Sequence, residues 1–131
     1  MKTLTIAIDF DGTLTKNNTF PEIGEPRLWM LKQAIAWRNA GHKLILWTCR
    51  EDVVNDDYNF TKRLYLTEAV NWCKSHGLEF DAVNKNVIEV VYPHVKTSRK
   101  INADVFVDDK AATFNDDGEI ITLSSNNYVN L

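Results

Sequence analysis

This sequence of 131 residues has few cysteines, no long apolar run and no excess of basic charge. Two cysteines, Cys49 and Cys73, cannot form a multi-disulfide framework, and we interpret both as small core residues in a reduced, cytoplasmic compartment. No apolar run approaches the roughly 18 residues that span a bilayer, which excludes membrane insertion. Fifteen Lys and Arg residues against 18 Asp and Glu give a net charge of −3, so nucleic-acid binding is not expected.

The remaining composition, 44% hydrophobic and 25% charged residues, is that of one ordinary globular domain spanning residues 1–131. A chain of this length buries one core between layers of secondary structure. A separate domain that covers a substrate is therefore not expected.

Apolar runs typical of buried strands alternate with helical periodicity along the chain. The predicted strands are 3–10, 42–48, 79–83, 103–107 and 119–123, and the predicted helices begin at Pro26 and near Thr61 and end before Gly41 and Gly77. Such alternation specifies right-handed βαβ units. It predicts an α/β fold, a three-layer α/β/α sandwich with a mostly parallel, Rossmann-like sheet.

Two parts of this prediction are less regular. Residues 84–99 show no clear pattern, and we predict irregular structure there. Trp29, Trp37 and Trp72 fall within the predicted helices, and we interpret them as packing residues of the core.

Polar side chains follow three of the predicted strands. Asp9 and Asp11 come after the first, Thr48 after the second, and Asp108 and Asp109 after a later one. Because ligands of open parallel sheets bind beyond the carboxyl ends of the strands, we expect these side chains to converge. Four carboxylates repel one another unless a cation lies between them, and an all-oxygen set suits Mg²⁺.

The same residues indicate a reaction. Asp9 could attack a phosphorus atom, while Asp11, two residues on, could protonate the leaving oxygen and later activate water. Gly12 permits a tight turn that brings peptide N–H groups toward a phosphate, and Thr48 offers a hydroxyl and an N–H. A lysine must then offset the charge of the transition state.

These motifs resemble those of the haloacid dehalogenase superfamily of aspartate-nucleophile phosphatases. Residues 9–14 (DFDGTL) resemble its first motif, 46–50 (LWTCR) its second, Lys100 its third and 107–109 (VDD) its fourth, so the resemblance spans about 3–110. It implies Asp9 as nucleophile and metal ligand, and Asp11 as general acid/base that also binds the metal through its carbonyl. Thr48 and Lys100 would bind phosphate, and Asp108 and Asp109 would complete the magnesium shell.

Two assignments stay open. Lys85, Lys96 and Lys100 all precede the acidic strand, and we favour Lys100 because residues 98–104 lead directly into that strand, as in small members of the superfamily. Arg50 either caps the loop that follows it or contacts the substrate.

The resemblance also bears on how the site is covered. Superfamily members usually carry a cap after the first motif or before the third, and here the gap at 15–25 is too short for one, so we expect a capless member. An open site suits a bulky phosphorylated substrate or closure by a neighbouring subunit of a homo-oligomer. We expect residues 51–60 and 85–99 to border its mouth.

The leading hypothesis is a Mg²⁺-dependent phosphomonoester hydrolase, and three alternatives compete with it. A calcium loop counted from Asp9 fails, because Leu14 and Phe20 stand where glycine and glutamate are required. A non-enzymatic phosphoacceptor module would use the same pocket, but Asp11 favours turnover. A phosphotransferase or a phosphatase of nucleic-acid ends would keep the chemistry and change the acceptor or substrate.

Overall fold

The computed structural model describes residues 2–54, 62–87 and 100–121. In chain order its elements are β1 (Thr5–Ile8), η1 (Phe10–Leu14), α1 (Leu28–Asn39), β2 (Lys43–Leu46), β3 (Asp52–Val53), β4 (Arg63–Leu64), α2 (Tyr65–Ser75), β5 (Ala82–Val83), β6 (Val105–Val107), β7 (Thr113–Phe114) and β8 (Ile120–Ile121). Most of the irregular stretch predicted at 84–99 and the end of the strand predicted at 119–123 lie outside the described residues.

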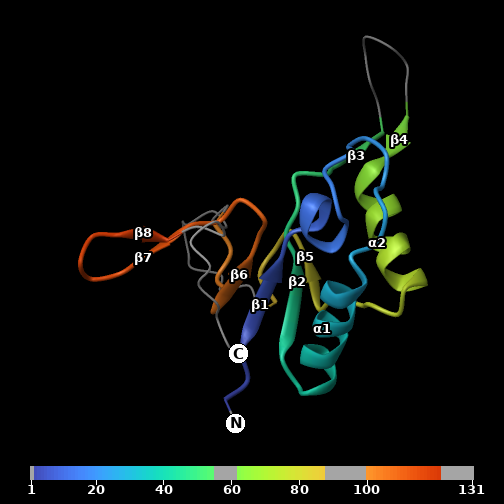
Figure 1. Cartoon of the computed structure of the whole chain (residues 1–131). Helices are drawn as coiled ribbons and strands as arrows, with labels where there is room; N and C mark the ends of the chain where they lie inside the picture. Colours follow the sequence, from blue (N-terminus) through green and yellow to red (C-terminus); the bar gives the residue numbers. More distant parts are fainter. Residues whose placement is uncertain (1, 55–61, 88–99, 122–131) are drawn as a thin grey trace, which may run out of the picture.

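The main sheet confirms the predicted α/β class. Its four strands are parallel in the order β5-β2-β1-β6, an arrangement compatible with a Rossmann-like fold (Figure 1). At the carboxyl edge Ile8 of β1 lies opposite Leu46 of β2 on one side and Val107 of β6 on the other. The strand order reverses at β1, because the chain moves outward through β2 and β5 and then returns to β6.

Both helices cover the same face of the sheet (Figure 1). Successive steps from β1 to β2 and from β2 to β5 go in one direction, so right-handed crossovers place α1 and α2 on one side. The core between these layers consists of buried side chains from the strands and helices: Ile6, Ile8, Leu44, Leu46, Met30, Leu31, Ala34, Ala69 and Cys73.

A smaller cluster lies on the opposite face. There Ala7 and Ile45 of the central strands pack with Ala82 of β5 and with Ile101 from the segment that leads into β6. The connection from β5 to β6 includes residues 88–99, outside the described part of the chain. A helical layer on this face, and with it the three-layer sandwich, therefore stays a prediction.

Two short antiparallel hairpins lie outside the main sheet. Strands β3 and β4 pair next to the start of α2, and the sequence patterns did not predict this pair. Strands β7 and β8 form a hairpin that projects away from the sheet (Figure 1), so the last predicted strand pairs with β7.

Two of the predicted core residues are exposed instead. Cys73 is buried, but the interpretation of Cys49 as a core residue is wrong, because β2 ends at Leu46 and Cys49 follows in an exposed turn. Trp29 is also exposed, since it lies on the outer side of the first turn of α1, whereas Trp37 and Trp72 pack against the core. Among the described residues no helix has the length and apolar character to cross a membrane.

Candidate active site

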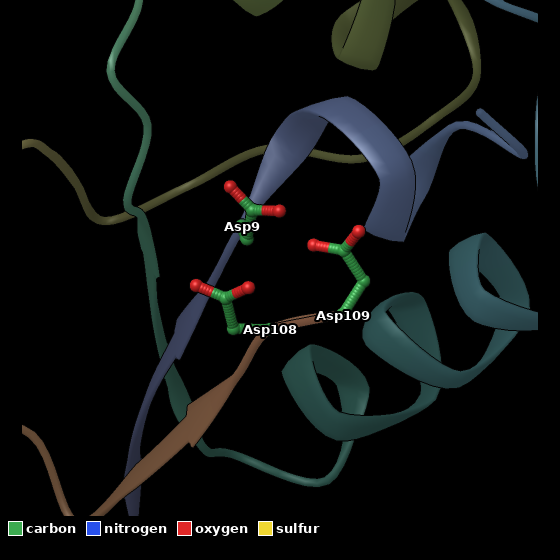
Figure 2. A group of neighbouring side chains, drawn as sticks. All are labelled: Asp9, Asp108 and Asp109. Carbon is green, nitrogen blue, oxygen red and sulfur yellow. The ribbon is translucent and has the colours of Figure 1, made fainter. Parts of the chain in front are cut away.

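Three aspartates meet at the carboxyl edge of the sheet (Figure 2). Asp9 follows β1, and Asp108 and Asp109 follow β6. The two strands are neighbours, and the Asp9 N–H extends their pairing by donating to the Val107 carbonyl at 2.9 Å. One carboxylate oxygen of each aspartate lies within 4.8 Å of the others. We call these three residues the aspartate cluster.

Thr13 links the two sides of the cluster. Its hydroxyl donates to Asp9 Oδ2 at 2.9 Å and accepts the Asp109 N–H at 3.0 Å. The buried position of Thr13 on η1, four residues after Asp9, makes both contacts possible. Sequence analysis did not assign Thr13 a role, although it lies inside the motif that carries Asp9. The spacing could have indicated it, because a hydroxyl one helical turn after an aspartate at a strand end can reach the carboxylate of that aspartate.

Gly12 is required by the closeness of Asp109. Its φ is +85°, and a Cβ there would lie 2.6 Å from Asp109 Oδ2. Any side chain at Gly12 would therefore displace a cluster member. The Gly12 N–H donates to Thr15 Oγ1 at 3.0 Å, and the binding of a phosphate by peptide N–H groups of this turn stays a prediction.

The environment of Asp9 favours its protonated form. Burial above all, together with the charges of Asp108 and Asp109, raises the pKa of Asp9 from 3.8 to about 7, against hydrogen bonds from Thr13 and the Phe10 N–H that lower it. A cation within the cluster would oppose the repulsion. The donors are all carboxylate oxygens, which fit Mg²⁺ or another hard divalent cation.

Asp11 does not join the cluster. Its Oδ2 and Oδ1 accept hydrogen bonds from Nε and Nη2 of Arg50 at 2.8 and 2.9 Å. The sequence predicted that Asp9 and Asp11 both face one cleft. The Arg50 guanidinium instead holds the Asp11 carboxylate in a bidentate ion pair outside the aspartate cluster. The Arg50 side chain is 1% exposed and the Asp11 side chain is 12% exposed. A metal contact through the Asp11 carbonyl stays a prediction.

Arg50 also ties three segments together. Its Nη1 donates to the carbonyls of Pro21 and Tyr65, and its Nη2 donates to that of Glu22. The guanidinium lies 5.2 Å from the centre of the Phe10 ring. These contacts do not cap the loop that follows Arg50, and in this conformation they engage the N–H groups that a substrate would need, so they support neither of the two roles left open for Arg50.

Thr48 lies at the end of β2, next to β1. Its N–H, expected to bind a phosphoryl oxygen, donates to Asn84 Oδ1 at 2.8 Å, while its hydroxyl accepts the Arg50 N–H at 3.2 Å. The Asn84 N–H in turn donates to the Leu46 carbonyl at 2.8 Å. Asn84 has a φ of 53°, a left-handed conformation that asparagine tolerates better than most residues, and sequence analysis did not single it out.

The lysine assignment stays a prediction. Lys100 is exposed at the start of the segment leading into β6, and Lys85 is exposed directly after Asn84. Lys96 lies outside the described residues.

Comparison with known proteins places the chain in a family. No protein-family model matches the sequence, and no curated protein matches it significantly. A solved structure of a conserved protein coded by a locus of Bacteroides thetaiotaomicron matches with a TM-score of 0.65 and 36% sequence identity, over 90% of this chain and 82% of that protein. The chain belongs to the same family as this Bacteroides protein. The shared fold thus extends over most of both chains.

The raised pKa of Asp9 predicts a pH-dependent stability in the absence of divalent cations. Between the ordinary value of 3.8 and about 7, the folded protein holds a proton on Asp9 that the unfolded chain releases. The free energy of unfolding should therefore fall as the pH rises from 5 to 8. Urea unfolding at both pH values should show a smaller fall for Asp9→Asn than for the wild type. Asp116→Asn, at an exposed turn, is the control, and equal falls in all three proteins would contradict this assignment.

The pair between Arg50 and Asp11 predicts a large effect on stability. Arg50→Met leaves the largely buried Asp11 carboxylate without its partner and should lower the free energy of unfolding by about 3–5 kcal/mol. Arg38→Met is the matched control, because Arg38 forms a more exposed ion pair with Asp81 at 3.3 Å and should cost at most about 1 kcal/mol. Urea titrations measure both, and equal losses would show that Arg50 has no special role.

Proposed function

We propose that this protein is a Mg²⁺-dependent phosphomonoester hydrolase of the haloacid dehalogenase superfamily that acts through an aspartyl-phosphate on Asp9. The observation that carries the proposal is the meeting of Asp9 with Asp108 and Asp109 at the ends of β1 and β6. These residues belong to two motifs about 100 positions apart that resemble the first and fourth motifs of that superfamily. Their place at the reversal of strand order is where open α/β sheets bind ligands.

The aspartate cluster would hold the metal through one oxygen from each residue. When bound, Mg²⁺ neutralises the carboxylates and polarises the phosphoryl group of the substrate. Gly12 supports this arrangement, because its missing side chain leaves room for the Asp109 carboxylate. Thr13 fixes the rotation of the Asp9 carboxylate through Oδ2 and leaves Oδ1 to act as nucleophile.

In the first step a carboxylate oxygen of Asp9 bonds to phosphorus, and the bond from phosphorus to the ester oxygen breaks. The leaving oxygen takes a proton from Asp11. In the second step Asp11 accepts a proton from water, whose oxygen attacks phosphorus and releases Asp9 and inorganic phosphate. Arg50 holds Asp11 in the described conformation, so this role requires the Asp11 carboxylate to turn from Arg50 toward the substrate. Thr48 and Lys100 would bind the phosphoryl oxygens.

The proposal includes a capless, three-layer sandwich in a cytoplasmic setting. Residues 15–26 form a short loop closed by a bridge between Thr15 and Pro26 and by the Lys16 N–H donating to the Glu25 carbonyl at 2.9 Å. A loop this short supports the expectation that no cap follows the first motif. Cys49 and Cys73 are both free, which is compatible with a reducing compartment.

One observation favours a second candidate, a phosphoacceptor module without fast turnover. Since Arg50 holds the Asp11 carboxylate away from the cluster, the group that would hydrolyse a phosphorylated Asp9 is not in place. Such a module would accumulate a stable phosphoprotein after treatment with acetyl phosphate, whereas the hydrolase would turn it over.

Replacement of the nucleophile tests the hydrolase directly. Asp9→Asn should lower kcat for p-nitrophenyl phosphate with Mg²⁺ by at least about a thousandfold, because no covalent intermediate can form. Circular dichroism checks that the fold is intact, and Asp116→Asn should keep wild-type activity. Full activity of Asp9→Asn would exclude the mechanism. A wild-type protein inactive on a panel of phosphate esters, yet stably phosphorylated by acetyl phosphate, would favour the module.

Metal binding can be measured without turnover. Mg²⁺ at a hundredfold excess over its Kd should stabilise the folded protein by about 2.7 kcal/mol, seen as a higher Tm. The shift should be larger at pH 8 than at pH 5, because a proton on Asp9 competes with the metal. Asp108→Asn should lose most of the shift, and Asp104→Asn, an exposed control just before β6, should keep it. Equal shifts in both variants would place the metal elsewhere.

A further inference from the structure

The first turn of α1 exposes apolar surface that the core does not use. Leu28 and Trp29 are 60% and 65% exposed, although the next two residues, Met30 and Leu31, are buried. One such side chain on a surface is ordinary, but two adjacent ones that include tryptophan form a patch.

This patch lies in a surface depression of about 700 Å³ with basic walls. The lining residues are Lys16, Asn17, Arg27, Leu28, Trp29 and Lys32. Three of the six are cationic and none is acidic, in a chain whose net charge is −3. The depression therefore combines an exposed indole with a local concentration of positive charge.

The depression lies toward the same end of the sheet as the candidate active site. Helix α1 returns antiparallel to β1, so its first turn lies at the same edge of the sheet as the aspartate cluster (Figure 1). Arg27 donates to the carbonyl of Gly12 at 3.2 Å and, through Nε, to that of Thr13 at 3.0 Å. Thr13 itself binds Asp9, so one residue connects the wall of the depression to the cluster.

The contacts within the depression leave surface for a ligand. The Arg27 guanidinium lies 5.9 Å from the centre of the Trp29 ring, and the indole stays largely exposed. Lys16 forms an exposed ion pair with Glu25 at 3.6 Å, a weak interaction that an incoming phosphate can replace. Lys32 lies three residues after Trp29, on the same side of the helix.

We infer that this depression binds the nucleotide portion of the substrate, with a base against Trp29 and a further phosphate group at Lys16 and Lys32. A nucleotide with at least two phosphate groups supplies both the flat ring that stacks on indole and the negative charge that the cations complement. A sugar phosphate lacks the aromatic ring, and a linear polyphosphate lacks any apolar face. The inference rests on the proposed function, because the phosphate group that is hydrolysed is assigned to the aspartate cluster.

Binding of adenosine 3′,5′-bisphosphate to the Asp9→Asn protein in the presence of Mg²⁺ tests the inference without turnover. In this background Trp29→Ala should weaken binding about tenfold in calorimetry, from the lost stacking. Lys32→Glu should weaken it by a similar factor, and more at low salt than at high salt. Because both side chains are at the surface, both variants should fold.

Two matched controls separate the depression from the rest of the surface. Phe114→Ala removes an exposed ring from the β7–β8 hairpin, and Lys43→Ala removes an exposed cation at the opposite edge of the sheet. Both should leave the Kd within about twofold, well below the loss expected for removing a stacked base.

The results that would overturn the inference are distinct. They are no binding of the bisphosphate, an unchanged Kd in Trp29→Ala, tripolyphosphate binding as tightly as the nucleotide, or a phosphotyrosine peptide binding more tightly. If the wild type binds the bisphosphate through Trp29 but hydrolyses no phosphate ester, the proposed function fails and the binding site stands. If the wild type hydrolyses aryl phosphates but Trp29→Ala does not change nucleotide binding, the nucleotide site fails and the proposed function stands.

Discussion

Repulsion among three carboxylates at one point of the sheet is the constraint around which the site is organised. Parallel pairing of β1 with β6 brings Asp9 beside Asp108 and Asp109, although the two strands are far apart in the sequence. Burial and this crowding make the ionised cluster unfavourable, and a proton on Asp9 or a divalent cation relieves it. Under the proposed mechanism, the same geometry would hold the cation and position the nucleophile.

The surrounding residues fit that constraint. Thr13 donates to the Asp9 carboxylate and accepts the Asp109 backbone N–H, and Gly12 leaves the space that the Asp109 side chain occupies. The other acidic residue of the first motif, Asp11, is removed from the crowding by Arg50. The two aspartates of that motif therefore sit in different electrostatic settings. Under the proposed mechanism this separation suits a nucleophile and an acid/base, provided that Asp11 can exchange Arg50 for the substrate.

The parts of the site that follow from strand periodicity could be predicted from the sequence. Asp9, Asp108 and Asp109 come directly after apolar strands, and parallel strands bring their ends to one edge. The position of Asp11 could not be predicted in this way, because its partner Arg50 lies 39 residues away and only the folded chain brings them together. Asn84 beside Thr48 was missed for the same reason.

Exposure was harder to predict than secondary structure. The ends of helix α1 were predicted to within a few residues, but Trp29 was expected in the core and is exposed. Periodicity indicates which residues share a face of the helix, and it does not indicate where the first turn of the helix meets the sheet. That error matters for function. The exposed indole beside Arg27 and Lys32 is the feature that, together with the aspartate cluster, points to a substrate larger than its phosphate group.

The most direct test of the central claim is a crystal structure of the protein with Mg²⁺ and beryllium fluoride, which mimics a phosphorylated aspartate. The account predicts trifluoroberyllate bonded to a carboxylate oxygen of Asp9, with Mg²⁺ held by Asp9, Asp108 and Asp109. Trifluoroberyllate on another residue, or Mg²⁺ bound away from these three aspartates, would contradict it.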